Sequence, residues 1–300
     1  MTEHHTTSSS SVWREYLVLT KPRVVLLMLL TAIIGMQLAC DHFIPILTLV
    51  FANIGIALSS ASAAVINQCV DRHIDSKMQR TKHRPLVSGN ITMTNALIFA
   101  LVLGFVGLAL LYFYINTITA LLTLFTLIGY AVFYTMFLKK ATPQNIVIGG
   151  AAGAAPPMLG WVAVTGQLDP QALLLMLIIY VWTPPHFWAL AIHRCEEYKN
   201  AGVPMLPVTH GISFTKLNIL LYSILLFIVT LLPYLIQMSG LFYLSTSIIL
   251  NIIMLYYSYK LYIDPVDKSL WAIKTFNYSI VYLMLLFFAL LVDHWWFILV

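Results

Sequence analysis

The chain has 300 residues, of which 60% are hydrophobic and 9% are charged, and its formal net charge is +5. Soluble domains carry about 25% charged residues, so a chain of this composition cannot cover its apolar surface in water and is expected to lie in a membrane. The three cysteines stand apart without metal-ligand spacing, and they support neither a disulfide framework nor a zinc site.

Residues 1–15 are polar and rich in Ser and Thr, and we expect a disordered cytoplasmic tail there, followed by a single transmembrane domain over residues 16–300. A spanning helix needs about 20 mostly apolar residues. Apolar runs of about that length occur at 24–40, 44–66, 96–115, 117–138, 146–165, 172–192, 217–238, 241–262 and 276–292. The sequence therefore predicts an all-α polytopic membrane protein, a bundle of about nine transmembrane helices.

The 16 Lys and Arg residues all fall in the N-terminal flank or in alternate loops between these helices. The other loops contain Asp41, His42 and Asp169, and the C-terminal end contains Asp293 and His294. Under the positive-inside rule the N-terminus is cytoplasmic and the C-terminus is external, as expected for a multi-pass protein of the cell inner membrane. The net charge then reflects topology and the lipid bilayer, and no pattern for binding nucleic acid is present.

A row of polar residues closes the second predicted helix. Asn67, Asp71 and Asp75 recur at every fourth position, so they lie along one helical face. Carboxylate and amide oxygens of this kind suit Mg²⁺ that also binds substrate phosphate, and the basic residues Arg80, Lys82 and Arg84 follow directly. Because ionisable groups at membrane depth are costly, we interpret the row as a metal–diphosphate site facing a cytoplasmic-side cavity.

A second polar segment closes the sixth predicted helix, with His186, His193 and Glu197 near one face. Pro184 and Pro185 are expected to break or kink this helix, as happens where backbone lines a cavity. Its acidic end lies on the same side of the membrane as the first motif. Glu197 is therefore a candidate ligand of a second Mg²⁺ ion, and Lys199 a further candidate for binding the diphosphate.

A motif runs from Asn67 to Leu86 with the pattern Asn-x₃-Asp-x₃-Asp-x₂-Met-x-Arg-Thr-x₂-Arg-Pro-Leu. It resembles the first signature of the intramembrane aromatic (UbiA-type) prenyltransferase superfamily. Four further segments are most similar to the protohaem-farnesylating branch of this superfamily: Thr20–Arg23, Gly153–Gly160, Pro185-His186 and Glu197–Val208. The resemblance covers nearly all of the chain from Tyr16 onward. One departure is that the second acidic motif, usually rich in aspartate, is Glu196-Glu197 here.

This resemblance implies an Mg²⁺-dependent enzyme that transfers the farnesyl group of farnesyl diphosphate to the vinyl group of haem B, which gives haem O. Haem B would be a substrate, and no tightly bound organic cofactor is expected. One or two Mg²⁺ ions, a terminal oxidase and a haem A synthase are the other expected partners. Neutral imidazole is a good iron ligand, so His186 and His193, with the neighbouring Arg194, are the candidate haem-binding residues.

Two alternatives remain open at this point. The acceptor of the prenyl group could be a quinone precursor or a chlorophyll-type ring on the same fold. The chain could also be a cation-coupled transporter, although transporter sites lie near the bilayer midplane and these acidic residues lie at one rim.

Overall fold

The computed structural model describes residues 9–265 and 270–299. The chain folds into α-helices joined by short links, with one π-helical segment. The helices are α1 (Ser9–Leu19), α2 (Pro22–Leu38), α3 (Ile46–Asp75), α4 (Pro85–Ser88), α5 (Met93–Tyr114), α6 (Thr117–Ile128), the π-helix η1 (Gly129–Leu138), α7 (Lys139–Ala141), α8 (Asn145–Ala154), α9 (Pro156–Thr165), α10 (Pro170–His193), α11 (Cys195–Asn200), α12 (Leu206–Thr209), α13 (Ile212–Leu235), α14 (Leu241–Ile263) and α15 (Leu270–Leu299).

Eight helical segments in the described residues are long and apolar enough to cross a membrane, and a ninth is formed if α1 and α2 are counted as one span bent by 49°. Continuous helices α6–η1 and α8–α9 each make one of the eight spans. The prediction of an all-α bundle of about nine membrane helices is therefore confirmed.

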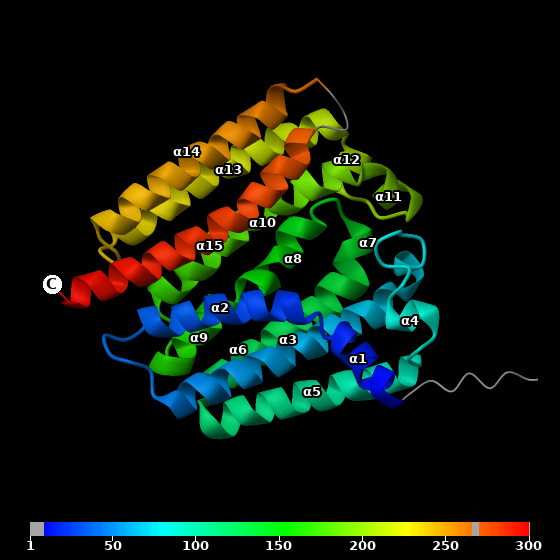
Figure 1. Ribbon diagram of the computed structural model, residues 1–300, viewed down its shortest axis with the longest axis horizontal. Coiled ribbons are helices and arrows are strands. Elements are labelled where there is room, and N and C mark those ends of the chain that lie inside the picture. The colour runs from blue at the N-terminus through cyan, green and yellow to red at the C-terminus, as the bar shows by residue number, and fades with distance from the viewer. Residues whose placement is uncertain (1–8, 266–269, 300) are drawn as a thin grey trace, which may run out of the picture.

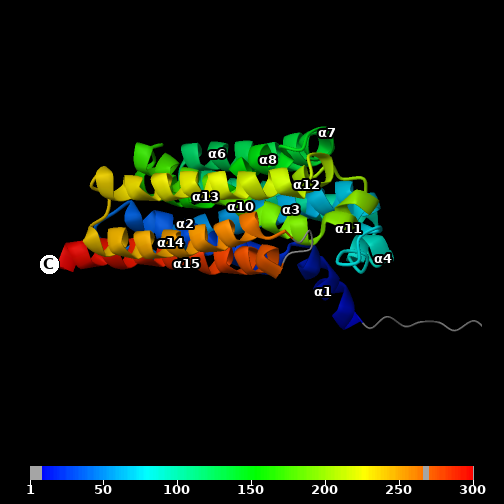
Figure 2. The same cartoon turned by 90° about the horizontal axis from the view of Figure 1, so that it is seen from above.

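The long helices run roughly parallel, and the short helices α4, α7, α11 and α12 gather at one end of the bundle, opposite the C-terminus (Figures 1 and 2). Helix α10 lies inside the bundle, and two thirds of its most apolar window is buried, whereas α5 exposes large apolar side chains such as Phe105 and Phe113. Exposed apolar faces of this kind are expected to contact lipid. The short helices form the rim that holds the polar residues.

Helices α2 and α9 approach each other unusually closely in this bundle. A Cβ atom added to Gly35 would collide with the carbonyl oxygen of Pro157, and one added to Gly160 would collide with that of Ala32. Only glycine permits this approach, as is common at helix interfaces in membranes. The contact fixes the position of α2 along the bundle axis, and therefore the position of the residues that precede α2.

Helix α3 continues past the apolar run to Asp75, so it includes the whole polar row, as the helical spacing of that row indicates. Helix α10 continues through Pro184 and Pro185, so of the expected break or kink the break does not occur. The Thr183 hydroxyl donates to the Ile179 carbonyl beside the prolines, which helps to satisfy the backbone there.

Helix α1 begins at Ser9, within the segment expected to be a tail, and residues 1–8 lie outside the described part of the chain. Tyr16 packs edge-to-face on Phe99 of α5, and Leu19 is fully buried. These contacts anchor α1 against the rim and orient the link that leads into α2.

The one-sided distribution of basic residues gives a direct test of topology. A reporter fused after Leu138 is expected to be cytoplasmic, and reporters fused after Gln167 or Val300 are expected to be external. Cysteine-accessibility or phosphatase fusions in intact cells would measure this. A cytoplasmic C-terminus would contradict the proposed orientation and require an even number of spans.

Candidate active site

The row predicted on α3 is present on its last three turns, and it is buried. Asn67, Asp71 and Asp75 are only 5%, 2% and 5% exposed. All three line a cavity of about 120 Å³ at the rim of the bundle. The other residues that line it come from separate segments of the chain: Lys21, Ile74, Met78, Arg80, Arg84, Tyr134, Lys139, Asn145, Ile146, Phe187, Tyr198, Val203 and Met205.

Each member of the row binds one basic side chain from a different segment. Lys21 Nζ donates to Asn67 Oδ1 at 3.0 Å, and Lys139 Nζ lies 2.5 Å from Asp71 Oδ2. Arg84 Nη1 lies 2.6 Å from Asp75 Oδ2. Two buried carboxylates would be strongly destabilising without such partners, so these cations are what allow the row to exist inside the protein.

The same cations make the cavity positive before any substrate binds. Two carboxylates face four basic side chains, because Arg80 also lines the cavity. A cavity with this excess of positive charge is suited to a multiply charged anion.

Two buried oxygens are still free to bind a metal ion. Asp71 Oδ1 and Asn145 Oδ1 have no hydrogen-bond partner among the described residues, and Asn145 is fully buried beside the row. Buried polar atoms are almost always paired, so two unpaired oxygens in one cavity point to a missing ligand. Oxygen donors of this kind fit Mg²⁺, and the residues present are therefore compatible with it.

The four residues predicted to bind diphosphate lie in two different settings. Arg80 and Arg84 line the cavity. Lys82 and Lys199 are exposed and are not among its lining residues. The structure thus brings the two arginines together with the row and leaves the two lysines at the surface of the rim.

The second acidic motif lies next to the cavity. Glu197 is in α11 with its Oε2 atom buried and without a hydrogen-bond partner in the described chain, but it does not line the cavity itself. Its neighbour Tyr198 does, and burial raises the pKa of the Tyr198 phenol. Tyr198 therefore offers a neutral hydroxyl donor at this wall.

The two histidines of α10 lie in different environments. His186 is 7% exposed and lies between the Trp182 and Phe276 rings, at centroid distances of 4.3 and 4.5 Å. His193 ends the helix and is exposed, and Arg194 after it is partly buried. The sequence predicted these two histidines near one helical face, and the structure buries the first and exposes the second.

The hydrogen bonds of His186 define which ring nitrogen carries the proton. His186 Nδ1 lies 2.6 Å from Ser279 Oγ, and that hydroxyl donates its own proton to the Phe276 carbonyl at 2.6 Å. The serine oxygen must then accept from Nδ1–H, which leaves Nε2 as a lone-pair donor. This is the pattern in which a second group orients a metal-binding imidazole.

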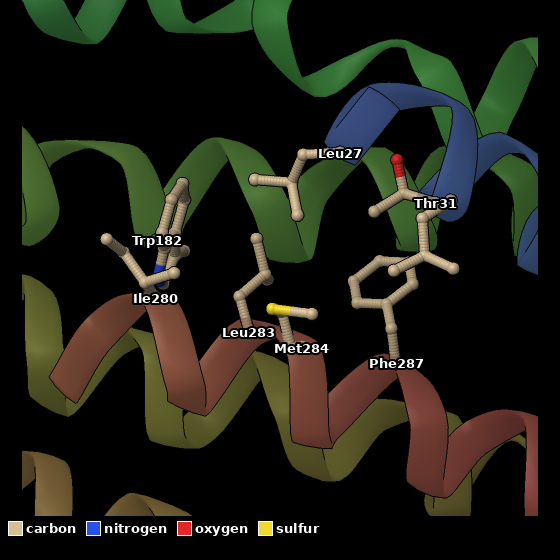
Figure 3. A pocket seen from close by; sticks show the side chains of 8 residues that line it. Leu27, Thr31, Trp182, Ile280, Leu283, Met284 and Phe287 are labelled. Atoms are coloured by element: carbon tan, nitrogen blue, oxygen red, sulfur yellow. The ribbon is translucent and has the colours of Figure 1, made fainter. Parts of the chain in front are cut away.

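A small apolar pocket lies on the other side of Trp182, between α2, α10 and α15 (Figure 3). Leu27, Leu283 and Phe287 line it with Trp182, and its volume is about 20 Å³. His186 packs on Trp182, which lines the apolar pocket. It also packs on Phe187, which lines the polar cavity. His186 therefore contacts one lining residue of each space, although it lines neither of them.

Sequence analysis assigned no role in the site to four polar residues of the cavity: Lys21, Tyr134, Lys139 and Asn145. Lys21 and Lys139 were interpreted as topology signals, and Lys21 also as part of the Thr20–Arg23 motif, although their positions at the cytoplasmic ends of spans could have indicated a role in the site. Tyr134 comes from the π-helix η1, and its ring fills the space left by the missing side chain of Gly149. π-Helical turns often occur at functional sites, but this one has no clear sequence signal.

Comparisons with known proteins agree with this geometry. The family model described as the UbiA prenyltransferase family matches residues 28–281. Protoheme IX farnesyltransferase of Legionella pneumophila strain Paris is 60% identical over 94% of this chain and 96% of its own. Protoheme IX farnesyltransferase 1 of Pseudomonas aeruginosa strain UCBPP-PA14 is 57% identical over 96% of this chain and 95% of its own.

Solved structures show the same fold at lower identity. A digeranylgeranylglyceryl phosphate synthase matches with a TM-score of 0.80 and 24% identity, over 95% of this chain and 99% of that one. A UbiA homologue from Archaeoglobus fulgidus bound to GPP and Mg²⁺ matches with a TM-score of 0.67 and 20% identity, over 92% of this chain and 99% of that one.

Proposed function

The chain belongs to the UbiA prenyltransferase family, and we propose that it farnesylates protohaem IX with Mg²⁺ in the buried cavity at the rim of the bundle. It is a multi-pass membrane enzyme that transfers a prenyl group. The observation that supports the donor site most strongly is the pair of unpartnered oxygens, on Asp71 and Asn145, in a cavity lined by basic side chains.

In this proposal Asn67, Asp71 and Asp75 hold Mg²⁺, and Glu197 is the candidate ligand of a second ion. When bound, the metal supplies positive charge that neutralises the leaving diphosphate. Arg80 and Arg84 bind phosphate oxygens, with Lys82 and Lys199 at the entrance. The Archaeoglobus homologue, which has the same fold and was solved with GPP and Mg²⁺, supports this arrangement.

The chemistry follows from charge separation in the cavity. The C–O bond of the allylic diphosphate breaks, and its electron pair leaves with the diphosphate. Tyr134 and Phe187 line the cavity and can stabilise the allylic cation through their ring faces. Exclusion of bulk water by the packed helices prevents early capture of the cation.

The acceptor then supplies the electrons for the new bond. The π electrons of a haem vinyl group form a C–C bond with the farnesyl carbon, and water adds to the resulting cation with loss of a proton. The product carries a hydroxyethylfarnesyl group. We propose that His186 Nε2 binds the haem iron, because its hydrogen bond to Ser279, its burial and its contacts with Trp182 and Phe187 suit that role.

The pocket of about 20 Å³ beside Trp182 is too small for a porphyrin ring or a prenyl chain. Binding of either would therefore need α2 and α15 to separate there. We place the enzyme in the cell inner membrane with the cavity on the cytoplasmic side, as one domain over residues 16–300. Its product would pass to a terminal oxidase or a haem A synthase.

Product analysis tests the proposed function. Purified protein in lipid nanodiscs, supplied with farnesyl diphosphate, haem B and Mg²⁺, should release diphosphate and form a haem heavier by farnesol, that is, by a farnesyl group plus hydroxyl. Mass spectrometry of the extracted haem would measure this. If the protein bound no haem but prenylated 4-hydroxybenzoate, the assignment of haem as the acceptor would be wrong, and only the family assignment would remain.

A further inference from the structure

Helix α1 leaves the side of the bundle at the rim (Figure 2), and it carries apolar side chains on both of its faces. One face packs on the protein, because Tyr16 contacts Phe99 of α5 and Leu19 is fully buried. The helical repeat places four residues on the other face. All four are exposed: Trp13, Arg14, Leu17 and Val18. Three of these are apolar, and the exposed fractions of Trp13, Leu17 and Val18 are 56%, 47% and 52%.

A fixed corner sets the direction of α1. Lys21 has left-handed backbone, with φ 52° and ψ 58°, directly before Pro22, and α1 and α2 are bent by 49° relative to each other there. The Leu19 carbonyl accepts a 2.6 Å hydrogen bond from the Gln68 amide, which ties the corner to α3. The exposed face of α1 therefore belongs to a helix that is held in one orientation, and its apolar side chains have to be covered from outside the described chain.

This face adjoins a surface of the bundle that contacts lipid. Val24 and Leu26, which follow the corner in α2, are 54% and 69% exposed. Exposed apolar side chains on a membrane-spanning helix are expected to contact lipid. A helix beside such a surface that has one apolar exposed face is stable at the boundary between headgroups and acyl chains, where Trp is also favoured.

The exposed charge next to this face is positive. The Arg14 guanidinium lies 5.5 Å from the centre of the Trp13 ring, and Arg23 is exposed in the first turn of α2. Glu15 is the one acidic residue of α1, and it is partly buried on the side that packs on the protein. Basic residues beside an apolar helical face are complementary to anionic lipid, because the phosphate layer attracts them while the apolar side chains enter the bilayer.

We propose that α1 is an interfacial helix that docks on anionic phospholipids of the leaflet around the rim. Trp13, Leu17 and Val18 lie at the boundary between headgroups and acyl chains, and Arg14 and Arg23 bind lipid phosphates. The corner after α1 contains Lys21, which lines the polar cavity. The docked helix therefore also supports one wall of that cavity from the membrane side.

The surroundings of Trp13 distinguish lipid from water and from protein. In full-length protein labelled with 5-fluorotryptophan and held in nanodiscs, Trp13→Phe identifies the Trp13 signal in the fluorine NMR spectrum. A lipid with a nitroxide near its headgroup should broaden this signal about threefold more than a water-soluble nickel chelate does. Trp188 is fully buried and should be broadened by neither probe. Stronger broadening of Trp13 by nickel would place α1 in water, and protection from both probes would place it against protein; either result would overturn the proposal.

A second measurement tests the charge of the lipid. When phosphatidylglycerol is titrated into phosphatidylcholine nanodiscs, the Trp13 signal should shift. One basic residue near an anionic surface contributes about a fivefold factor, so Arg14→Gln should lower the apparent affinity for phosphatidylglycerol by about that much. Lys77→Gln removes the same charge from an exposed residue in the link after α3, and it should behave as the wild type does. No response to phosphatidylglycerol, or equal losses in Arg14→Gln and Lys77→Gln, would overturn the proposal. Neither measurement needs turnover, so both are independent of the proposed function.

Discussion

Turnover by the Asp71→Asn variant is expected to fall about a thousandfold or more, with the protein still folded and inserted in the membrane. Asp71 is the most buried member of the row, and its Oδ1 atom has no hydrogen-bond partner among the described residues. Asparagine keeps the shape but loses the charge that would hold the metal. It also leaves Lys139 without its carboxylate partner, so the charge balance of the cavity changes by one unit.

Initial rates of haem O formation, with Mn²⁺ binding measured in parallel, would test this. Asp41→Asn is the matched control, because it makes the same substitution at an exposed aspartate at the opposite end of the bundle. The wild type should lose activity in EDTA and regain it with Mg²⁺. Substantial turnover by Asp71→Asn, with normal Mn²⁺ binding, would reject the metal assignment of the row.

Glu197→Gln should be damaging but milder than Asp71→Asn. Its Oε2 atom is buried and unpaired, which fits a role in binding, but the residue does not line the cavity. A loss of turnover as large as that of Asp71→Asn would indicate that Glu197 is as important for turnover as the α3 row.

The bundle and the row could be predicted from sequence because both depend on local patterns. Spanning helices follow from the length of apolar runs, and the alignment of Asn67, Asp71 and Asp75 follows from the helical repeat. The apolar run ends at residue 66 because polar residues begin there, whereas the helix itself continues through the polar row to Asp75.

The partners of the row could not be predicted in the same way. Lys139 meets Asp71 across 68 positions, and Lys21 meets Asn67 across 46. Such pairs depend on how helices pack, which no spacing rule contains. The same limit applies to α10, where helical spacing put His186 and His193 on one face but packing buried only the first.

His186→Ala is expected to abolish most haem binding while leaving donor binding nearly intact. The imidazole is held by two stacked rings and by Ser279, so the direction of Nε2 is fixed. Loss of an axial ligand should weaken haem B binding about a hundredfold or more and remove the Soret shift. The affinity for farnesyl thiodiphosphate, a slowly reacting donor analogue, should change by less than about threefold, because His186 does not itself line the cavity.

Ser279→Ala provides the more specific test, since it keeps the imidazole but removes the group that sets its tautomer. An outer partner of a metal-binding histidine typically contributes about ten- to a hundredfold in affinity, so an intermediate loss is expected. His193→Ala should have the smaller effect because His193 is exposed, and His210→Ala, at an exposed position on the same rim, serves as the control. A His186→Ala protein with an unchanged haem spectrum would show that the imidazole only packs between Trp182 and Phe276. Haem binding would then have to be sought through Arg194 and the propionates.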